Sequence, residues 1–475
     1  MKILLIAPSQ KQIYGPNVSP PYPPLGLLMV GAVLKKVSQQ EVKLIDVNTE
    51  EYSEEKLISH LNDFRPDLVG ITCVTPTFGS ARDIARVVKK TLPVPVVFGG
   101  IHPTIAPEDC IKEKDIDFVV VGEGELTIQE FIEYLNQKRT DFENINGLWH
   151  KKAQEIFRGQ PRELIKDLDS LPFPAWDLIS DLEKYRSPDA LRHPVISIMT
   201  SRGCPFNCIF CCSKQIFGRT FRARSSDSLM TEIRYYIDEF GAKELHIMDD
   251  VFTLNKERAM EICKAILRNK FDLTLSFANG IRADSIDDEL LQVLKDTGFQ
   301  DLGFGVETGD EEILKSIKKS TTKESMRRAF KLAKKFKFNT WGFFIIGLPG
   351  ETKDTVKKTI NFAIELDPDF AKFLILKPFP GSEVYNDFNS HGYIKNFNYD
   401  DYGVYTAPVH DLPGLSAKEM LAWQKKAYIR FYLRPRKIIK HLLKIKSLTQ
   451  LKSNVLMVKF LLNRIFSYGH NPKNS

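Results

Sequence analysis

Four of the chain's seven cysteines lie within nine residues, in the segment Ser201-Arg-Gly-Cys204-Pro-Phe-Asn-Cys208-Ile-Phe-Cys211-Cys212. Cys204, Cys208 and Cys211 follow a C-x3-C-x2-C spacing directly after the apolar run 195–199, so we expect them on a loop at the carboxyl end of a strand. Three thiolates on such a short loop can hold three irons of a 4Fe–4S cluster, which leaves the fourth iron free to bind a substrate.

Two other interpretations of this loop must be compared with the iron–sulfur one. A zinc site would require four protein ligands at C-x2-C type spacings, and the neighbouring sequence has no second cysteine pair and no cysteine–histidine cluster. Chance clustering of free thiols is disfavoured because exposed thiols are reactive. Cys212 is not needed for the spacing, and we interpret it as a packed free thiol.

The composition indicates a globular protein of two or three domains, with 475 residues, 43% hydrophobic and 27% charged. The cysteine pattern favours a reducing cytosol over a disulfide framework. The N-terminal apolar run is short and is broken by Pro8, so it predicts no secretion signal. No run approaches the ~18 apolar residues that a membrane-spanning helix needs. We therefore expect a cytoplasmic protein.

Residues 1–140 alternate short apolar runs with helical patterns, which predicts an α/β domain with a doubly wound parallel sheet. The five expected strands are 2–7, 42–46, 68–73, 94–99 and 118–122, with helices such as 26–37 and 80–91 between them. Ligands of such sheets bind at the carboxyl ends of the strands. The loops there are rich in glycine, which lets a bulky planar ligand approach the backbone, although turns need glycine as well.

Residues 191–395 repeat the alternation six times, which predicts a partial (βα)6 TIM-like barrel. Its expected strands are 195–199, 244–248, 274–277, 302–306, 341–346 and 370–376, with helices such as 227–240 and 256–269. The chemistry of such barrels gathers at the carboxyl ends of the strands. The proline-rich residues 141–190 lie between the two parts, and we interpret them as a linker.

The cysteine loop, with Phe210 before Cys211, the glycine-rich loops and the motifs at the barrel strand ends together resemble the radical S-adenosylmethionine (SAM) enzymes that carry a cobalamin-binding domain. The resemblance is to the methylase-like subgroup, which includes hopanoid and magnesium-protoporphyrin cyclase-like relatives. It implies a Rossmann- or flavodoxin-like cobalamin domain before the radical SAM barrel. It also implies that Cys204, Cys208 and Cys211 are the catalytic ligands of the 4Fe–4S cluster. The SAM contacts that it implies are Phe210, Asp249, Arg282, Glu307 and Gly347. The cobalamin contacts that it implies are Leu25, Gly26, Thr75, Gly100, His102, Gly122 and Glu123.

The chain departs from other cobalamin proteins in one respect. The D-x-H-x-x-G motif, whose histidine binds cobalt in those proteins, is absent, and Gly-Gly-Ile precedes His102. The resemblance therefore implies cobalamin without a protein histidine on cobalt, and His102 can equally cap or pack. In the barrel, Asp249, Asp250 and Arg282 can equally pair with each other or cap helices.

By resemblance, an electron from a reductant such as flavodoxin or ferredoxin cleaves SAM to a 5'-deoxyadenosyl radical, which takes hydrogen from an unactivated carbon. Methylcobalamin then methylates that carbon, so we expect a cobalamin-dependent C-methyltransferase. The alternatives are a non-methylating radical rearrangement, a cyclisation, a lipid head-group reaction, tRNA modification, or a non-catalytic cobalamin or iron–sulfur sensor. A sensor would leave the motifs at the strand ends without a purpose.

The C-terminal region, residues 396–475, concentrates positive charge. Residues 416–475 contain fourteen lysines and arginines and one acidic residue, Glu419. Ser416 and Glu419 predict a capping box that opens a helix to about Leu433. Beyond Pro435, one helical face is apolar (Ile438, Ile439, Leu442, Leu443, Ile445) and the other basic (Lys437, Lys440, Lys444). Such a helix can lie on the inner face of an anionic membrane, or dock on the barrel with its basic face in solvent. We expect a small-molecule substrate and no nucleic acid partner. A lipid or isoprenoid fits this region best, and peptides, antibiotics and tetrapyrroles stay open as alternatives.

Overall fold

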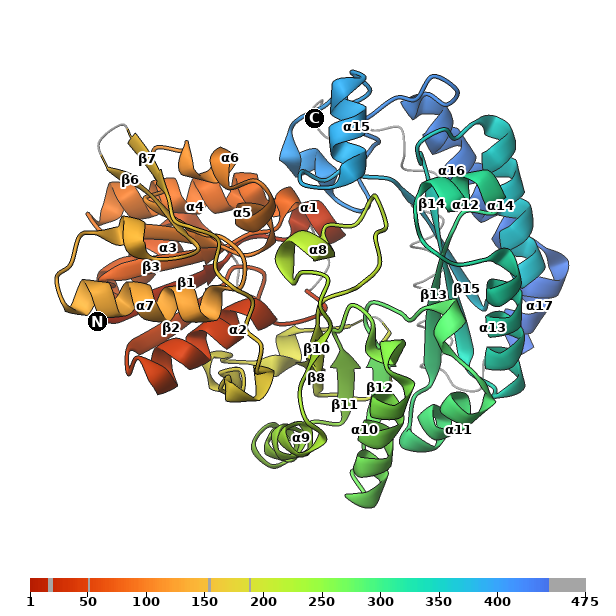
Figure 1. The fold of residues 1–475 in the computed structure, drawn as a ribbon, viewed down its shortest axis with the longest axis horizontal. Helices are drawn as coiled ribbons and strands as arrows, with labels where there is room; N and C mark the ends of the chain where they lie inside the picture. The colour runs from red at the N-terminus through yellow and green to blue at the C-terminus, as the bar shows by residue number, and fades with distance from the viewer. Residues whose placement is uncertain (16–19, 50–51, 153–154, 188, 444–475) are drawn as a thin grey trace.

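The N-terminal part of the chain forms a twisted sheet, and the middle part forms an open barrel beside it (Figure 1). The structure is a computed structural model, and it describes residues 1–15, 20–49, 52–152, 155–187 and 189–443. The short helix α8 (Ser213–Ile216), which follows the cysteines, lies where the two parts meet.

All five strands predicted for the first domain are present, with bounds within two residues of those expected. They pair in parallel in the order β2-β1-β3-β4-β5. Their bounds are β1 (Lys2–Ala7), β2 (Glu41–Asp46), β3 (Leu68–Thr72), β4 (Val96–Gly99) and β5 (Phe118–Val120). The helices of this domain are α1 (Lys11–Tyr14), α2 (Leu25–Ala32), α3 (Glu54–Phe64), α4 (Phe78–Thr91), α5 (Ile101–Ile105), α6 (Pro107–Ile111) and α7 (Gly124–Asn136).

Helices cover both faces of this sheet, which confirms the doubly wound prediction. Side chains alternate along a strand, so Leu4 and Ile6 of β1 join a core that includes residues of α3 and α4. Ile3 and Leu5 point the other way, into a core that includes residues of α2 and α7. Because both faces are buried, each strand is a continuous apolar run. Burial of each aliphatic side chain contributes about 1.5–3 kcal/mol to the stability of the fold.

The sheet has seven strands, so the predicted count of five is wrong. β6 (Leu148–Lys152) and β7 (Glu155–Arg158) come from the segment that we interpreted as linker, and they extend the sheet as antiparallel strands beyond β5. The apolar signal is weak there because β6 has only five residues, two of which are the lysines Lys151 and Lys152, and only Leu148 and His150 are fully buried. The rest of that segment is irregular, and Trp176 anchors it against Tyr236 of the barrel, with ring centroids 5.7 Å apart.

The six predicted barrel strands are all present. They are β8 (Val195–Ile198), β11 (Glu244–Ile247), β12 (Thr274–Phe277), β13 (Asp301–Glu307), β14 (Asn339–Ile346) and β15 (Phe370–Ile375). They form two parallel three-stranded sheets, β8-β11-β12 and β13-β14-β15. Between β12 and β13 the contact is reduced to isolated bridges, where Ile281 N donates to Gly303 O at 2.8 Å.

Helices surround the outside of the barrel (Figure 1). They are α9 (Ser226–Phe240), α10 (Lys256–Arg268), α11 (Asp288–Thr297), α12 (Glu311–Ser316), α13 (Lys323–Lys335), α14 (Lys353–Leu366) and α15 (Glu383–Ser390). A hairpin of β9 (Ser201–Arg202) and β10 (Arg222–Ala223) encloses the cysteine loop. The barrel is left open on the side of the first domain (Figure 1).

Helix α16 (Ala417–Tyr432) closes the free edge of β15. Its predicted capping box is confirmed, because the Ser416 hydroxyl accepts from Glu419 N and the Glu419 carboxylate accepts from Ser416 N. The hydroxyls of Tyr428 and Tyr432 then donate to the backbone oxygens of Phe373 and Ala371 at 3.3 and 3.0 Å. Side chains of α16 thereby replace the missing neighbour of an edge strand.

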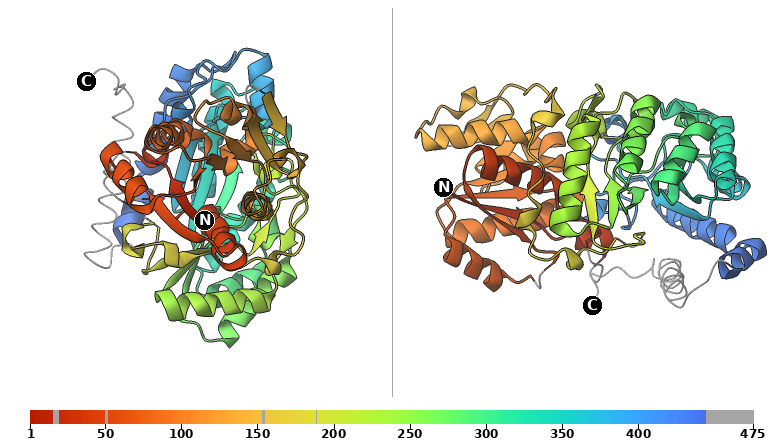
Figure 2. Two further views of the ribbon diagram at one scale, coloured as in Figure 1. Left: turned by 90° about the vertical axis from the view of Figure 1, so that its left-hand side faces the viewer. Right: turned by 90° about the horizontal axis from the view of Figure 1, so that it is seen from below.

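Helix α17 (Pro435–Leu443) follows α16 on the side of the barrel away from the first domain (Figure 2). Our prediction of a solvated lysine face is wrong for Lys437, which is 2% exposed and bonds to Pro368 O and Asp367 after α14. Ile438 and Ile439 face outward instead, 43% and 56% exposed. Lys444 and Ile445 of the predicted pattern lie outside the described residues. Within the described part of the chain, no helix is both long and apolar enough to cross a membrane.

Candidate active site at the cysteine loop

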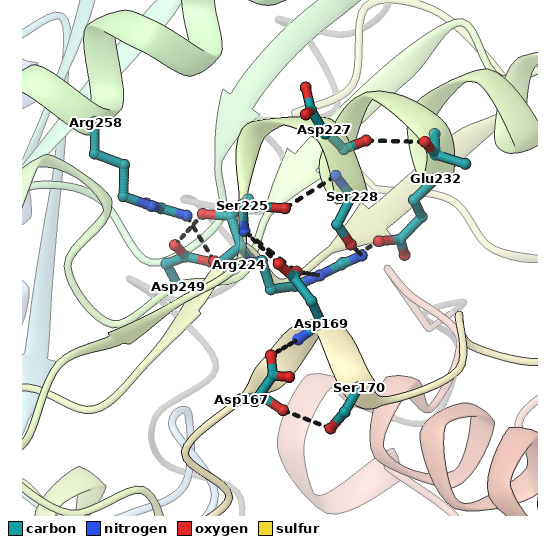
Figure 3. A network of polar contacts seen from close by, with 12 residues as sticks. Asp167, Asp169, Ser170, Arg224, Ser225, Asp227, Ser228, Glu232, Asp249 and Arg258 are labelled. Atoms are coloured by element: carbon teal, nitrogen blue, oxygen red, sulfur yellow. Dashed lines mark hydrogen bonds and ion pairs between the residues drawn. The ribbon is translucent and has the colours of Figure 1, made fainter.

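The cysteine loop is held by a polar network at the end of β8. Asp249, which is 3% exposed, accepts hydrogen bonds from Thr200 N at 2.6 Å and from the Thr200 and Ser201 hydroxyls. Thr200 O accepts from Arg258 Nη2 at 2.6 Å and from Arg224 N at 3.0 Å. The network continues through Arg224 to Glu232 of α9 (Figure 3). Asp249, predicted as a SAM contact, thus fixes the backbone that leads into the cysteines.

Cys204, Cys208 and Cys211 lie on this one loop and are not disulfide-bonded. Among the residues that the structure describes, no three Cys, His, Asp or Glu side chains are placed so that they could hold a metal ion. Burial raises the pKa of each thiol, to about 11 for Cys211. Lys319 and Arg282 act in the opposite direction on Cys208, because nearby cations favour its thiolate. Three soft sulfur donors beside two cations suit an iron–sulfur cluster, whose thiolate ligands carry negative charge.

Cys212 and Phe210 take up packing positions on the same loop. The Cys212 thiol donates to Pro380 O at 3.5 Å, which agrees with a packed free thiol. Phe210 packs against the barrel core. Gly203, just before the first cysteine, has φ +91°, and a Cβ there would collide with the carbonyl oxygen of Thr220. The approach to Cys204 therefore requires glycine.

Two predicted SAM residues lie at this loop with a third residue that the sequence did not reveal. Glu307 ends β13 with φ +64° and forms an ion pair with Lys319. Arg282 lies over the ring of Phe206, 3.5 Å from its centroid, and donates to Lys319 O at 3.0 Å. Arg282 also pairs with Asp284, and not with Asp249 or Asp250 as the structural alternative predicted. Lys319 follows α12 with no local signal, since it is one of many surface-type lysines in the sequence.

Asp250 and Gly347 are the remaining residues that were singled out at the carboxyl ends of the barrel strands. Asp250 accepts from Ser213 Oγ at 2.6 Å, and burial raises its pKa. Gly347 follows β14 with φ +95°, and its N–H donates to Glu351 Oε2 at 2.6 Å. Burial raises the pKa of Glu351 to about 8, so this side chain is protonated at neutral pH. A Cβ at Gly347 would lie 2.9 Å from His410 Nε2, which explains the glycine.

The predicted cobalamin loops meet at the carboxyl edge of the first sheet. Nothing lies within 4 Å of the place that a Cβ would occupy at Gly26 or Gly122, so open space adjoins both. At Gly100, by contrast, a Cβ would lie 2.6 Å from Thr72 Oγ1. Leu25 begins α2 and lines a small cavity with Met29. Free space beside strand-end glycines is what a large flat ligand requires.

His102 is fully buried beside these loops. Its Nδ1 lies 3.2 Å from the Thr75 hydroxyl, while its Nε2 has no hydrogen-bond partner among the described residues. The ring packs between Phe78 and Tyr399, with centroids 4.5 and 4.8 Å away. Burial lowers the pKa of His102 to about 3, so the ring is neutral. These contacts agree with the packing alternative, and the contact with cobalamin stays a prediction.

Glu123 forms a buried ionic link between the two domains. Its two carboxylate oxygens accept from Arg202 Nη1 and Arg222 Nη1, both at 2.9 Å, and Ile165 N donates to it at 2.8 Å. Arg202 also pairs with Glu125 at 2.5 Å. Arg202 lies two residues before Cys204, so this carboxylate fixes the cysteine loop relative to the first domain.

The comparisons with known proteins agree with this geometry. Residues 198–363 match the model of the radical SAM superfamily, and residues 12–132 match that of the B12 binding domain. An uncharacterized methyltransferase of Pyrococcus horikoshii is 36% identical over 93% of this chain and 94% of its own length. The chain belongs to the cobalamin-binding radical SAM enzymes.

Further relatives of this radical SAM enzyme support the assignment. The cytidylyl-2-hydroxyethylphosphonate methyltransferase of Streptomyces wedmorensis is 27% identical over 89% of this chain and 88% of its own length. The structure of OxsB, a cobalamin-dependent SAM radical enzyme, superposes with a TM-score of 0.76 at 18% identity, covering 98% of this chain and 72% of OxsB. The predicted fold class, enzyme class and cofactors (a 4Fe–4S cluster, SAM and cobalamin) are thereby confirmed at the level of the family. The individual SAM and cobalamin contacts stay predictions.

Proposed function

We propose that this enzyme methylates an unactivated carbon of a small molecule held between its two domains. The observation that carries the proposal is the meeting of the two cofactor edges. Helix α5, which follows Gly100, contacts α8, which follows Cys212. In the same place, a Cβ on Gly381 would lie 3.2 Å from Ile105 Cβ. One substrate can therefore reach both sites without leaving the protein.

The chain's own residues bind the reactants and orient them. When bound, the cluster supplies the electron that cleaves SAM, and cobalamin carries the methyl group. Glu307 can accept from an ammonium group or a ribose hydroxyl at the end of β13. The three donor nitrogens of Arg282 bond to Asp284, Lys319 O and Ser320 O, so we assign it to holding Lys319 in place.

The test is anaerobic reconstitution with iron, sulfide and hydroxocobalamin, followed by removal of unbound ligand and a visible spectrum. Cobalamin retained beside iron–sulfur absorption is expected. Reaction with SAM that carries a trideuterated methyl group then labels the cobalamin. Retention of iron–sulfur absorption without cobalamin would refute methylation and leave a plain radical SAM enzyme.

We assign the electron donor to an acidic flavodoxin- or ferredoxin-type protein. Lys214 and Arg219 both donate to Asn207 Oδ1, at 3.3 and 2.6 Å, beside Cys208, so cations surround the loop. Replacing Arg219 by Glu is expected to slow SAM cleavage driven by reduced flavodoxin, because like charges repel the donor. Cleavage driven by dithionite should be unchanged. An equal loss with both reductants would contradict the assignment.

Helix α17 supports contact with an anionic membrane on the cytoplasmic side. Leu433, Ile438 and Ile439 are 60%, 43% and 56% exposed, in a region that is strongly basic. Wild-type protein should sediment with vesicles that contain phosphatidylglycerol, and the double substitution Ile438→Asp and Ile439→Asp should abolish this. If the doubly substituted protein still sediments with the vesicles, α17 is not the membrane contact.

A further inference from the structure

The segment between α15 and α16 contacts both the first domain and the carboxyl ends of the barrel strands. We call residues 396–410 the strap, and it belongs to the blue part of the ribbon in Figure 1. Its short helical turn Tyr399–Tyr402 contacts α1, α4 and the turn Thr75–Thr77. These three elements follow strands β1 and β3 of the first sheet. The strap therefore leaves the barrel and packs on the carboxyl edge of the first domain.

Tyr399 anchors the strap to the first domain. Its ring packs against His102 with centroids 4.8 Å apart and planes 67° apart. Its hydroxyl donates to Asp109 Oδ2 at 2.6 Å. Gly403 approaches the same domain closely, since a Cβ there would collide with Gln12 O of α1. His102 is a predicted cobalamin contact, so Tyr399 fixes one side of a ring that is expected to lie at that cofactor.

Lys377 holds the middle of the strap at the barrel. It lies two residues after the end of β15 and is 5% exposed. Its ammonium group donates to Asp401 O at 3.0 Å, to Thr406 Oγ1 at 2.9 Å and to Ala407 O. A buried cation is stable only when oxygen atoms replace the water that it has lost. Lys377 and the strap therefore hold each other in place.

His410 holds the end of the strap at the turn after β14. Its ring is fully buried, and its Nε2 lies 3.1 Å from Gly347 O. Burial lowers the pKa of His410 to about 4, so the ring is neutral. Its proton is on Nε2, because a carbonyl oxygen only accepts hydrogen bonds. Gly347 N is bonded to Glu351 on its other side, so both polar groups of this predicted SAM contact are held.

We propose that the strap positions both cofactor loops, with Tyr399 as the positioning residue on the cobalamin side and His410 as the positioning residue on the SAM side. Lys377 fixes the segment between them. A loop that is already ordered loses less conformational entropy when its ligand binds, so each contact adds to the affinity for one cofactor. The inference concerns how the cofactors are bound, and it goes beyond the proposed methyl transfer.

Binding of each cofactor tests the two ends of the strap separately. Equilibrium dialysis of the enzyme reconstituted with iron and sulfide, without reductant, measures the Kd of SAM and that of hydroxocobalamin. His410→Phe should raise the Kd of SAM about tenfold, because it leaves the buried Gly347 O without a donor. Tyr399→Leu should raise the Kd of hydroxocobalamin about fivefold, because it removes the ring that packs on His102. Each variant should leave the other Kd within about twofold of wild type.

Conservative variants separate positioning from a general loss of stability. His410→Gln keeps an N–H group that can reach Gly347 O, and it should restore the SAM affinity. Tyr399→Phe keeps the ring on His102, and it should bind hydroxocobalamin more tightly than Tyr399→Leu does. Lys377→Met should raise both Kd values, because it releases the middle of the strap. A urea midpoint for each variant confirms that it is folded.

The chain offers a matched control in β6. His150 is buried like His410, and the two rings lie 5.0 Å from the rings of Phe157 and Phe388 respectively. His150→Phe is the same substitution away from the strap, and it should leave both Kd values unchanged. An equal rise of the SAM Kd in the two Phe variants would overturn the proposal.

Other outcomes would overturn the proposal as well. If His410→Phe and Tyr399→Leu weaken the two cofactors equally, the strap has a structural role only. The same conclusion follows if Lys377→Met changes neither Kd. If the strap variants behave as expected but no labelled methyl group reaches cobalamin, the strap stands and the proposed reaction falls. If the methyl group reaches cobalamin while no strap variant alters a Kd, the reaction stands and the strap falls.

Discussion

The link between the two domains allows a quantitative prediction for the substitution Glu123→Gln. The carboxylate contacts Arg202, Arg222 and Ile165 N, and the side chains of Glu123, Arg202 and Arg222 are only 3%, 5% and 6% exposed. Glutamine keeps the shape of the side chain but removes its charge. Both guanidinium groups then lose a counter-charge in a site that excludes water.

The expected loss is about 3 kcal/mol of unfolding free energy. Removing one partner of a buried ion pair typically costs about 3–5 kcal/mol, because the other charge is left uncompensated. The lower end of this range applies to Glu123→Gln because both arginines retain another partner. Arg202 still pairs with Glu125 at 2.5 Å, and Arg222 still donates to Ile165 O at 2.6 Å. Urea titration of the reconstituted enzyme measures the difference from wild type.

The surface pair of Glu108 and Arg158 supplies the matched control. Its nitrogen–oxygen distance is 2.6 Å, but its side chains are 40% and 52% exposed. Glu108→Gln should cost less than about 1 kcal/mol, because solvent screens the pair. If the two glutamine variants lose equal stability, the argument from burial is refuted.

The same link predicts a pH dependence. Burial by itself would raise the pKa of Glu123, but hydrogen bonds from Arg222 and Arg202 outweigh it, and the pKa lies below its usual value. Its contribution to stability is therefore present above the ordinary carboxyl pKa and is lost as pH falls toward the folded-state pKa. The stability difference between wild type and Glu123→Gln should shrink below about pH 4.5.

Three further predictions concern the barrel. Cys208→Ala should abolish the iron–sulfur absorption of the reconstituted enzyme, whereas Cys212→Ala should retain it, and an equal loss in both variants would contradict the assignment of the ligands. Glu351→Gln tests the raised pKa of Glu351, which lies at about 8. The stability of the wild type relative to this variant should fall as pH rises from about 4.5 to 8, because the folded protein disfavours ionisation of Glu351. A stability difference that does not change with pH would contradict the raised pKa. Gly303→Ala should lower the free energy of unfolding by about 1–3 kcal/mol, because the new methyl group would lie 2.8 Å from the Phe343 ring, and an unchanged urea midpoint would contradict this packing.

Much of the fold could be predicted from the sequence because its signals are local. A strand buried on both faces is a continuous apolar run, so β1 and ten other strands were found within two residues of their bounds. Antiparallel β6 and β7 were missed because β6 mixes two lysines with its two buried residues, and β7 has no fully buried residue at all. The orientation of α17 was also missed, since an amphipathic pattern does not say which face meets the barrel.

The residues of the candidate site also fall into those with a local signal in the sequence and those without one. Cys204, Cys208 and Cys211 lie within one loop, so their spacing alone predicts a cluster, and Glu307 was found from its place at a strand end. Lys319, which pairs with Glu307, is separated from it by a whole helix and carries no local signal.

What the sequence determined by itself is therefore the order of the elements, the cluster loop and the family of cofactors, because each depends on neighbouring residues. Only the tertiary structure decided which distant side chains meet. The salt bridge of Glu123 with Arg202 spans 79 positions. The register of β14 against β15 placed Trp341 beside Phe370 and Phe343 beside Lys372. Such contacts arise from how strands and helices pack, and packing depends on the whole chain at once.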